Sequence, residues 1–276
     1  MKRILTAAVS IPLALAAIFA LSDLWLFAAL VVVVELAILE YLRIARLLNA
    51  GNAPGILLLI VPIAAALMTP GVLPARSPIA ASDALLIGAI FLAVGVGSLV
   101  VLSRVSMANG LIAIGALGFG LSYFAIPVAS LVRLRQIGGP WLLVLCLAIV
   151  WLGDTFAFYC GRQWGRRKFA PSISPKKTWA GSIAGLSAGL IAAVVWSLWA
   201  LGGLSLKALV LALVVGMAAQ LGDLVESLLK RGAGVKDSGT LFPGHGGVMD
   251  RMDALFFAAP AMWLAIWVMG SEGIVP

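Results

Sequence analysis

Long apolar runs separated by short polar breaks extend along almost the whole chain. The runs are roughly 18 to 22 residues long, which is the length that an α-helix needs to cross about 30 Å of hydrocarbon. The alternation expected of a membrane β-strand is missing, and helices satisfy their backbone hydrogen bonds internally where there is no water. The pattern therefore predicts an all-α, polytopic membrane bundle of roughly nine transmembrane helices. These are expected near residues 4–21, 24–42, 56–73, 84–102, 107–128, 140–160, 179–202, 206–229 and 254–270.

Composition supports a membrane location, because 63% of the residues are hydrophobic and only 11% are charged. The net charge of +8 is unevenly distributed. With the N-terminus in the cytoplasm, nearly all Lys and Arg residues fall in inside loops, and only Arg76, Arg133, Arg135 and Lys207 fall outside. This bias predicts a cytoplasmic N-terminus. Arg133 and Arg135 are then either ordinary outer-loop residues or a sign that the fifth and sixth spans are misplaced.

The unusual polar residues gather in the second half of the chain. We therefore expect an N-terminal set of transmembrane helices at 1–130 and a catalytic transmembrane region at 131–276, with cytoplasmic loops at 161–178 and 230–250. The richness in small residues is compatible with a homodimer. Membrane lipids are expected partners, and nucleic acid is not.

The first polar segment places Asp154 at the end of a membrane helix, followed by many cations. It then runs through Ser174 and Pro175, which predict the start of a helix, to Lys176 and Lys177. Lysines bind phosphate as point charges, and the N–H groups of a helix start also attract anions. The segment suits a polyanion; the alternative is an ordinary positively charged inside loop.

The second polar segment begins at the end of the eighth predicted span. Asp223, Glu226, Ser227 and Lys230 are three or four residues apart, so they share one face of a helix. Asp223 lies about two turns inside the apolar run. A carboxylate at that depth is costly and indicates a functional role.

Two further acids, Asp250 and Asp253, are one turn apart at the start of the ninth predicted span. Asp253 could instead stabilise the positive end of the helix dipole. If Asp250 meets Asp223, the two would form an oxygen-rich site for a hard cation such as Mg²⁺. His245 is the only histidine and lies beside Gly246 and Gly247, which would let backbone approach a ligand closely. It could contact phosphate or transfer a proton, or it could be an ordinary loop residue.

These residues resemble the signature of the phosphatidate cytidylyltransferases, also called CDP-diacylglycerol synthases. The matching positions are Ser227, Leu229, Lys230, Arg231, Lys236, Asp237, Gly239, Phe242, Pro243, His245, Gly246, Gly247, Val248, Asp250, Arg251, Met252 and Asp253. The segment from Asp154 to Trp179 is similar to the family's upstream element. One departure is Ala180, where the family usually has glutamate, so any essential role of that glutamate is in doubt here.

The resemblance implies the reaction of CTP with phosphatidic acid to give CDP-diacylglycerol and pyrophosphate at the cytoplasmic face of the inner (plasma) membrane. It implies Mg²⁺ at Asp223, Asp250 and Asp253, with room for a second cation. The implied catalytic residues are Asp223, Lys230, His245 and Asp250. The implied substrate-binding residues are Ser174, Lys176, Lys177, Ser227, Arg231, Lys236, Asp237, Gly246, Gly247 and Arg251.

Two other functions remain open at this point. A CTP-dependent transferase acting on another lipid phosphate would use the same charged residues. An ion-coupled transporter would also place acids inside the membrane. Transporters, however, usually carry matching interrupted helices in related halves, whereas the polar residues here are confined to one half.

Overall fold

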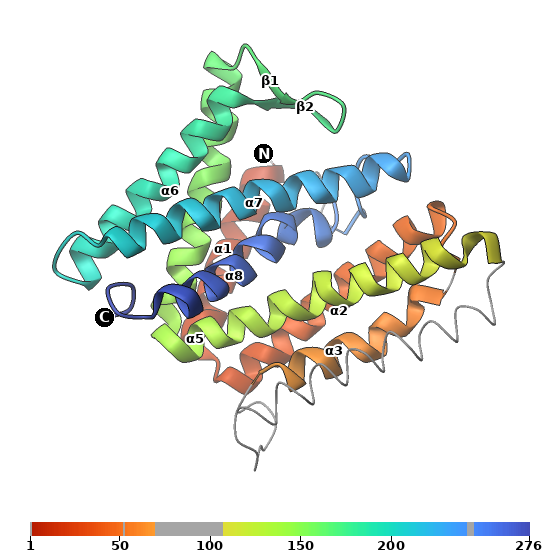
Figure 1. Ribbon diagram of the computed structural model, residues 1–276, viewed down its shortest axis with the longest axis horizontal. Coiled ribbons are helices and arrows are strands. Elements are labelled where there is room, and N and C mark those ends of the chain that lie inside the picture. Colours follow the sequence, from red (N-terminus) through yellow and green to blue (C-terminus); the bar gives the residue numbers. More distant parts are fainter. Residues whose placement is uncertain (1, 52, 70–106, 242–245) are drawn as a thin grey trace. The chain divides into compact units, whose positions relative to one another are not determined.

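The computed structural model describes residues 2–51, 53–69, 107–241 and 246–276 (Figure 1). Within these ranges the chain is helical apart from one short hairpin. The elements are α1 (Lys2–Ala20), α2 (Asp23–Leu47), η1 (Ala53–Ile56), α3 (Leu57–Leu67), α5 (Met107–Trp164), β1 (Lys168–Ala170), β2 (Ser174–Thr178), α6 (Trp179–Ala200), α7 (Leu206–Gly232) and α8 (Met249–Met269).

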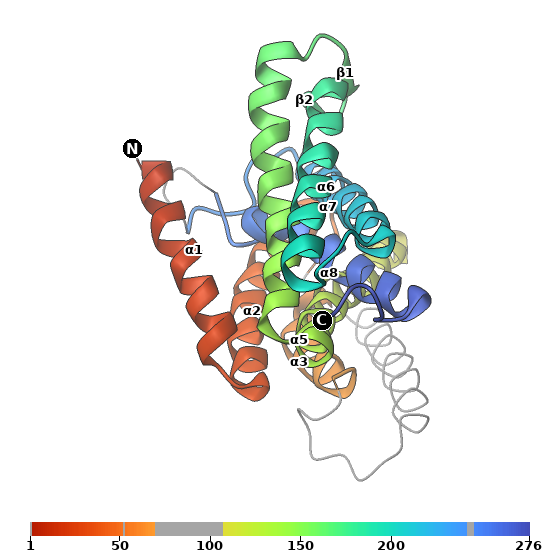
Figure 2. The same cartoon turned by 90° about the vertical axis from the view of Figure 1, so that its left-hand side faces the viewer.

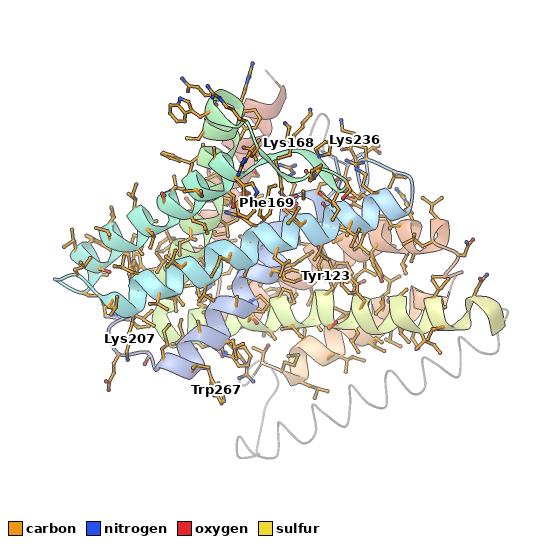
Figure 3. The ribbon with its side chains drawn as sticks, turned by 45° about the horizontal axis from the view of Figure 1, so that its top comes forward. Tyr123, Lys168, Phe169, Lys207, Lys236 and Trp267 are labelled. Atoms are coloured by element: carbon orange, nitrogen blue, oxygen red, sulfur yellow. The ribbon has the colours of Figure 1, made fainter. Side chains whose placement is uncertain are left out.

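Five of these helices are long and apolar enough to cross a membrane, namely α2, α5, α6, α7 and α8. Large apolar side chains such as Leu111, Leu206 and Trp267 are exposed on the helix surfaces (Figure 3). Such exposure suits a helix whose solvent is lipid. The prediction of a multi-pass helical membrane protein is thereby confirmed. The predicted span at 84–102 lies outside the described residues, and the total of nine spans and the orientation stay predictions.

The chain forms two compact units, each assembled from separate stretches of sequence. The first contains residues 1–133 and 229–252, and the second contains residues 134–228 and 253–276. Short segments of the C-terminal half thus belong to the unit formed by the N-terminal helices.

In the first unit, α2 and α3 pack against the first part of α5 (Figure 1). The Tyr41 hydroxyl of α2 donates to the carbonyl oxygen of Ala116 at 2.7 Å. A Cβ at Gly120 would lie 2.9 Å from the Tyr41 ring, so a side chain there would separate these helices. The glycine therefore sets the closeness of the packing.

Helix α5 merges the predicted spans 107–128 and 140–160. Its only non-helical backbone is at Gly138 (φ −131°, ψ 18°) and Gly139 (φ 66°, ψ −168°). Arg133 and Arg135 therefore lie on a helix, which agrees with the alternative that the boundaries of the fifth and sixth spans were misplaced. The Arg133 Nε donates to the carbonyl oxygen of Met68 at 2.5 Å, which satisfies a charged group and a carbonyl at the end of α3.

In the second unit, the end of α5 and the start of α6 are joined by the hairpin β1–β2 (Figure 2). The two helices approach through glycines. A Cβ at Gly185 would lie 2.8 Å from the carbonyl oxygen of Gly153, and one at Gly181 would lie 3.2 Å from the Cα of Gly161. This close backbone approach is typical of membrane helix pairs.

Candidate active site

A buried ion pair forms the centre of the polar residues in the first unit. The Nζ of Lys230, from the last turn of α7, lies 2.5 Å from Oδ1 of Asp250, in the first turn of α8. Both residues are at most 9% exposed. Two buried charges of opposite sign must be matched, because an isolated charge in this environment is very costly.

Asp250 also fixes the backbone of the chain that leads to α8. Its Oδ2 accepts hydrogen bonds from the Gly247 N–H at 2.7 Å, the Ser238 N–H at 2.9 Å and the Ser238 hydroxyl at 2.8 Å. Gly246 has a φ of +80°, and a Cβ there would collide with the Asp250 carboxylate. The glycine of the signature is therefore required by local geometry.

A second ion pair, only partly buried, lies in the second unit. The Nζ of Lys177, in β2, is 2.7 Å from Oδ2 of Asp223, on α7. The Ser227 hydroxyl donates to Asp223 Oδ1 over a longer distance of 3.4 Å. Asp223 and Ser227 therefore do share one face of the helix, as their spacing predicts.

Asp253 lies near the Lys177–Asp223 pair and does not cap helix α8. Helix α8 begins at Met249, so Asp253 lies in its second turn, beyond the usual capping position. Its acidic neighbours are Asp223, Glu226 and Asp154. Glu226 is fully buried and Asp154 is exposed. Acids grouped in this way are relieved of their mutual repulsion either by protonation or by a bound cation.

The hairpin corrects the prediction that a helix starts at Ser174 and Pro175. Residues Ser174–Thr178 form β2, which pairs antiparallel with β1 in the register Lys168↔Thr178 and Ala170↔Ser174. The helix starts at Trp179 instead, because the Thr178 hydroxyl oxygen accepts the Gly181 N–H and caps it. The backbone of Ser174 is therefore not a helix N-terminus.

The hairpin displays cations and holds one aromatic contact. Lys176 is exposed, and Lys168 is exposed on β1 (Figure 3). Phe169 packs edge-on against Trp179 with ring centroids 4.7 Å apart. The contact fixes the base of the hairpin on α6 and leaves the lysines accessible to an anion.

The other predicted site residues are mostly at the surface of the first unit. Lys236, Asp237 and Arg251 are exposed, and the exposed Arg231 donates to the carbonyl oxygen of Val235 at 2.9 Å. His245 lies outside the described residues. The exposed cations are available to a soluble polyanion, whereas Lys230 is not at the surface.

One buried acid at this site was missed by the sequence analysis. Glu40 of α2 is 6% exposed and accepts hydrogen bonds from the backbone N–H groups of Val248 and Met249. Its signal was present, since a carboxylate within the apolar run of α2 meets the criterion that singled out Asp223. Its partners, about two hundred positions away in sequence, were not readable from the pattern.

Among the described residues, no group of three or more His, Cys, Asp or Glu side chains is arranged to hold a metal ion. The donor chemistry nevertheless suits a cation that arrives with a phosphate ligand. Asp250 Oδ1 accepts one hydrogen bond, and Asp223 Oδ1 accepts one long one, so each carboxylate retains acceptor capacity. Magnesium commonly uses only one or two carboxylates and completes its shell with substrate phosphates and water.

These features define a multi-pass helical membrane protein with two acid–lysine ion pairs, one buried and one partly buried. The chain matches the model of the cytidylyltransferase family over residues 1–269, and it belongs to that family.

Curated relatives carry a more specific name. Phosphatidate cytidylyltransferase of Brucella abortus biovar 1 (strain 9-941) is 44% identical over 151 residues, which are 52% of this chain and 54% of the relative. The protein of that name from Haemophilus influenzae is 40% identical over 145 residues, covering 48% and 50%. That from Staphylococcus saprophyticus is 41% identical over 143 residues, covering 51% and 55%. The chain spans about half the length of the curated relatives it matches.

Proposed function

We propose that this protein transfers the cytidylyl group of CTP to phosphatidic acid, giving CDP-diacylglycerol and pyrophosphate. The observation that carries the proposal is the family match across residues 1–269. The name shared by the relatives supports the choice of substrates. The complete signature from Ser227 to Asp253 supports it as well.

The reaction needs charge neutralisation more than it needs a covalent intermediate. An oxygen of the lipid phosphate attacks the α-phosphorus of CTP and forms the new P–O–P linkage. The bond from that phosphorus to the bridging oxygen breaks, and pyrophosphate leaves with the electron pair. Both reactants are anions, so cations must offset their repulsion and stabilise the leaving group.

Lysines already paired with carboxylates suit this task. Lys230 neutralises Asp250, and Lys177 neutralises Asp223. We propose that these lysines turn towards phosphates when the nucleotide binds. Lys176, Lys236, Arg231 and Arg251 are exposed and would contact the triphosphate or the pyrophosphate. Ser174, Ser227, Asp237, Gly246, Gly247 and, from the sequence alone, His245 complete the proposed substrate-binding and catalytic set.

Magnesium is part of the proposal, with Asp223, Asp250 and Asp253 as its ligands. The acceptor capacity left on Asp223 and Asp250 and the negative charge around Asp253 support this choice. A bound Mg²⁺ would withdraw charge from the phosphates. A second cation is compatible with the number of acids.

Topology enters the proposal from the charge distribution of the sequence. We propose nine spans, a cytoplasmic N-terminus, and a location in the inner (plasma) membrane with the site facing the cytoplasm. CTP would arrive from the cytoplasm while the diacyl chains stay in the bilayer. A homodimer is also proposed, on the small-residue helix faces.

The proposal is tested with purified protein in detergent, phosphatidic acid, Mg²⁺ and CTP labelled at either the α- or the γ-phosphate. Label from α-labelled CTP should enter an organic-extractable product only when phosphatidic acid is present, and label from γ-labelled CTP should stay in the aqueous phase. Transfer of γ-label would indicate a lipid kinase instead. If α-label is transferred to another lipid phosphate and not to phosphatidic acid, that other lipid is the acceptor substrate.

A further inference from the structure

Helix α2 carries two acids within its apolar run, Glu35 and Glu40, and Glu40 is the one that bonds to the described start of α8. Its two carboxylate oxygens have separate partners. Oε1 accepts the Val248 N–H at 3.0 Å, and Oε2 accepts the Met249 N–H at 3.0 Å. Since α8 begins at Met249, Glu40 caps that helix from another helix. The first N–H groups of a helix have no partner within it and attract negative charge.

The same carboxylate reaches Asp250 through one hydroxyl group. The Oγ of Ser238 lies 2.8 Å from Glu40 Oε2 and 2.8 Å from Asp250 Oδ2. A hydroxyl group has one proton, so it donates to one carboxylate at a time. The Ser238 N–H donates to Asp250 in addition, which keeps the serine in place. Glu40 and Asp250 are thus linked through a shared partner.

Two glycines of this region pack directly on Glu40. A Cβ at Gly239 would lie 2.8 Å from the carboxylate carbon of Glu40, and a Cβ at Gly247 would overlap the same group. Only glycine lets the backbone approach so closely. The chain that follows α7 and the chain that precedes α8 therefore both pack closely against the carboxylate of Glu40.

We infer that Glu40 is a positioning residue for the reaction, which holds residues 238–239 and 246–250 so that Asp250 keeps its orientation towards Lys230. The inference rests on the proposed function, because the reaction is what the orientation serves. Glu40 itself touches no reacting atom in this account. It acts through Ser238 and through the backbone at the start of α8.

The test compares Glu40→Gln with Glu35→Gln, which makes the same change on the same helix at a carboxylate whose Oε1 has no hydrogen-bond partner among the described residues. Full-length protein in detergent is measured by hydrogen–deuterium exchange and by α-label transfer from CTP to phosphatidic acid. In Glu40→Gln an amide NH₂ replaces one acceptor oxygen, so it faces a backbone N–H. We expect exchange at Val248 and Met249 to accelerate at least tenfold and kcat to fall at least tenfold. The KM for phosphatidic acid should stay within twofold, and Glu35→Gln should change none of these values more than twofold.

A double-mutant cycle separates positioning from general stabilisation. If Glu40 acts through Ser238, the effect of Glu40→Gln on kcat should shrink at least threefold in a Ser238→Ala background. Additive effects would overturn the link through Ser238. Unchanged exchange in Glu40→Gln would overturn the cap, and faster exchange with unchanged kcat would overturn the positioning role. Glu40→Asp, which keeps the charge but shortens the side chain, serves the same purpose if the Gln variant does not fold.

The two hypotheses fail in different ways. If the unmutated protein transfers no label to any lipid phosphate, the proposed function fails. The exchange measurement still decides whether Glu40 holds Val248 and Met249, because it needs no substrate.

Discussion

The buried pair of Lys230 and Asp250 makes a prediction about stability that differs from the usual expectation for a metal ligand. Asp250→Asn is nearly isosteric, yet it removes the negative charge beside a buried ammonium group. It also presents an NH₂ group either to Lys230 or to the N–H groups of Ser238 and Gly247. Breaking a buried ion pair in this way costs about 3–5 kcal/mol. The variant should therefore lose stability as well as turnover.

Lys230→Met should cost less, about 3 kcal/mol, because Asp250 keeps the three hydrogen bonds to its Oδ2. The double variant Lys230→Met/Asp250→Asn removes both charges together. Replacing a buried pair by neutral groups of similar size is close to neutral, so we expect a loss of only about 1–2 kcal/mol. The coupling between the two substitutions should then be about 4–7 kcal/mol in free energy of unfolding.

Thermal unfolding in detergent measures this directly. For a chain of this size the coupling corresponds to roughly 10–25 °C in Tm. The matched control is Lys236→Met/Asp237→Asn, the same changes at exposed positions, for which each variant should stay within about 0.5 kcal/mol. Additive losses in the double variant at the buried positions would refute the account of a mutually neutralising pair. No variant lacking Asp250 should show cytidylyl transfer.

Three other outcomes are expected. Lys177→Ala removes a partly exposed partner of Asp223, so the free energy of unfolding should change by less than about 1 kcal/mol. The KM for CTP should rise about tenfold, and an unchanged KM would show that Lys177 does not bind the nucleotide. Gly185→Ala should lower the free energy of unfolding by about 1–3 kcal/mol because its Cβ would press on the Gly153 carbonyl, whereas Gly203→Ala, at a position with open space, should not. Excess chelator should abolish label transfer, and added Mg²⁺ should restore it; full activity in chelator would remove the metal from the mechanism.

Sequence reasoning was most successful where a single helix carried the signal. The apolar runs predicted α2, α6, α7 and α8 because a membrane helix must be apolar over a fixed length. The spacing of Asp223 and Ser227 predicted their shared face because the helix period is fixed. Both rules depend only on neighbouring positions.

The errors arose where the local signal was ambiguous. Ser174 and Pro175 are common at helix starts, but they are equally acceptable in an edge strand, where a proline needs no ladder partner. Strand β2 has no alternating apolar pattern that could have identified it, since it reads Ser-Pro-Lys-Lys-Thr. The sequence could not decide whether Arg133 lies in a loop or on a helix, because its bond to Met68 could not be read from sequence.

In both acid–lysine pairs, a carboxylate and an ammonium group neutralise each other's charge. An unpaired carboxylate or ammonium would be costly in a chain surrounded by lipid, so each must be neutralised before substrate arrives. Asp250 is paired with Lys230 in the interior, and Asp223 is paired with Lys177 at a partly exposed position. A metal–nucleotide complex offers both partners at once, a cation for the carboxylates and phosphates for the lysines. Either ion alone would leave one charge of the buried Lys230–Asp250 pair without a partner. CTP and Mg²⁺ should therefore bind cooperatively, and a calorimetric titration that shows equal CTP affinity with and without Mg²⁺ would contradict this exchange of partners.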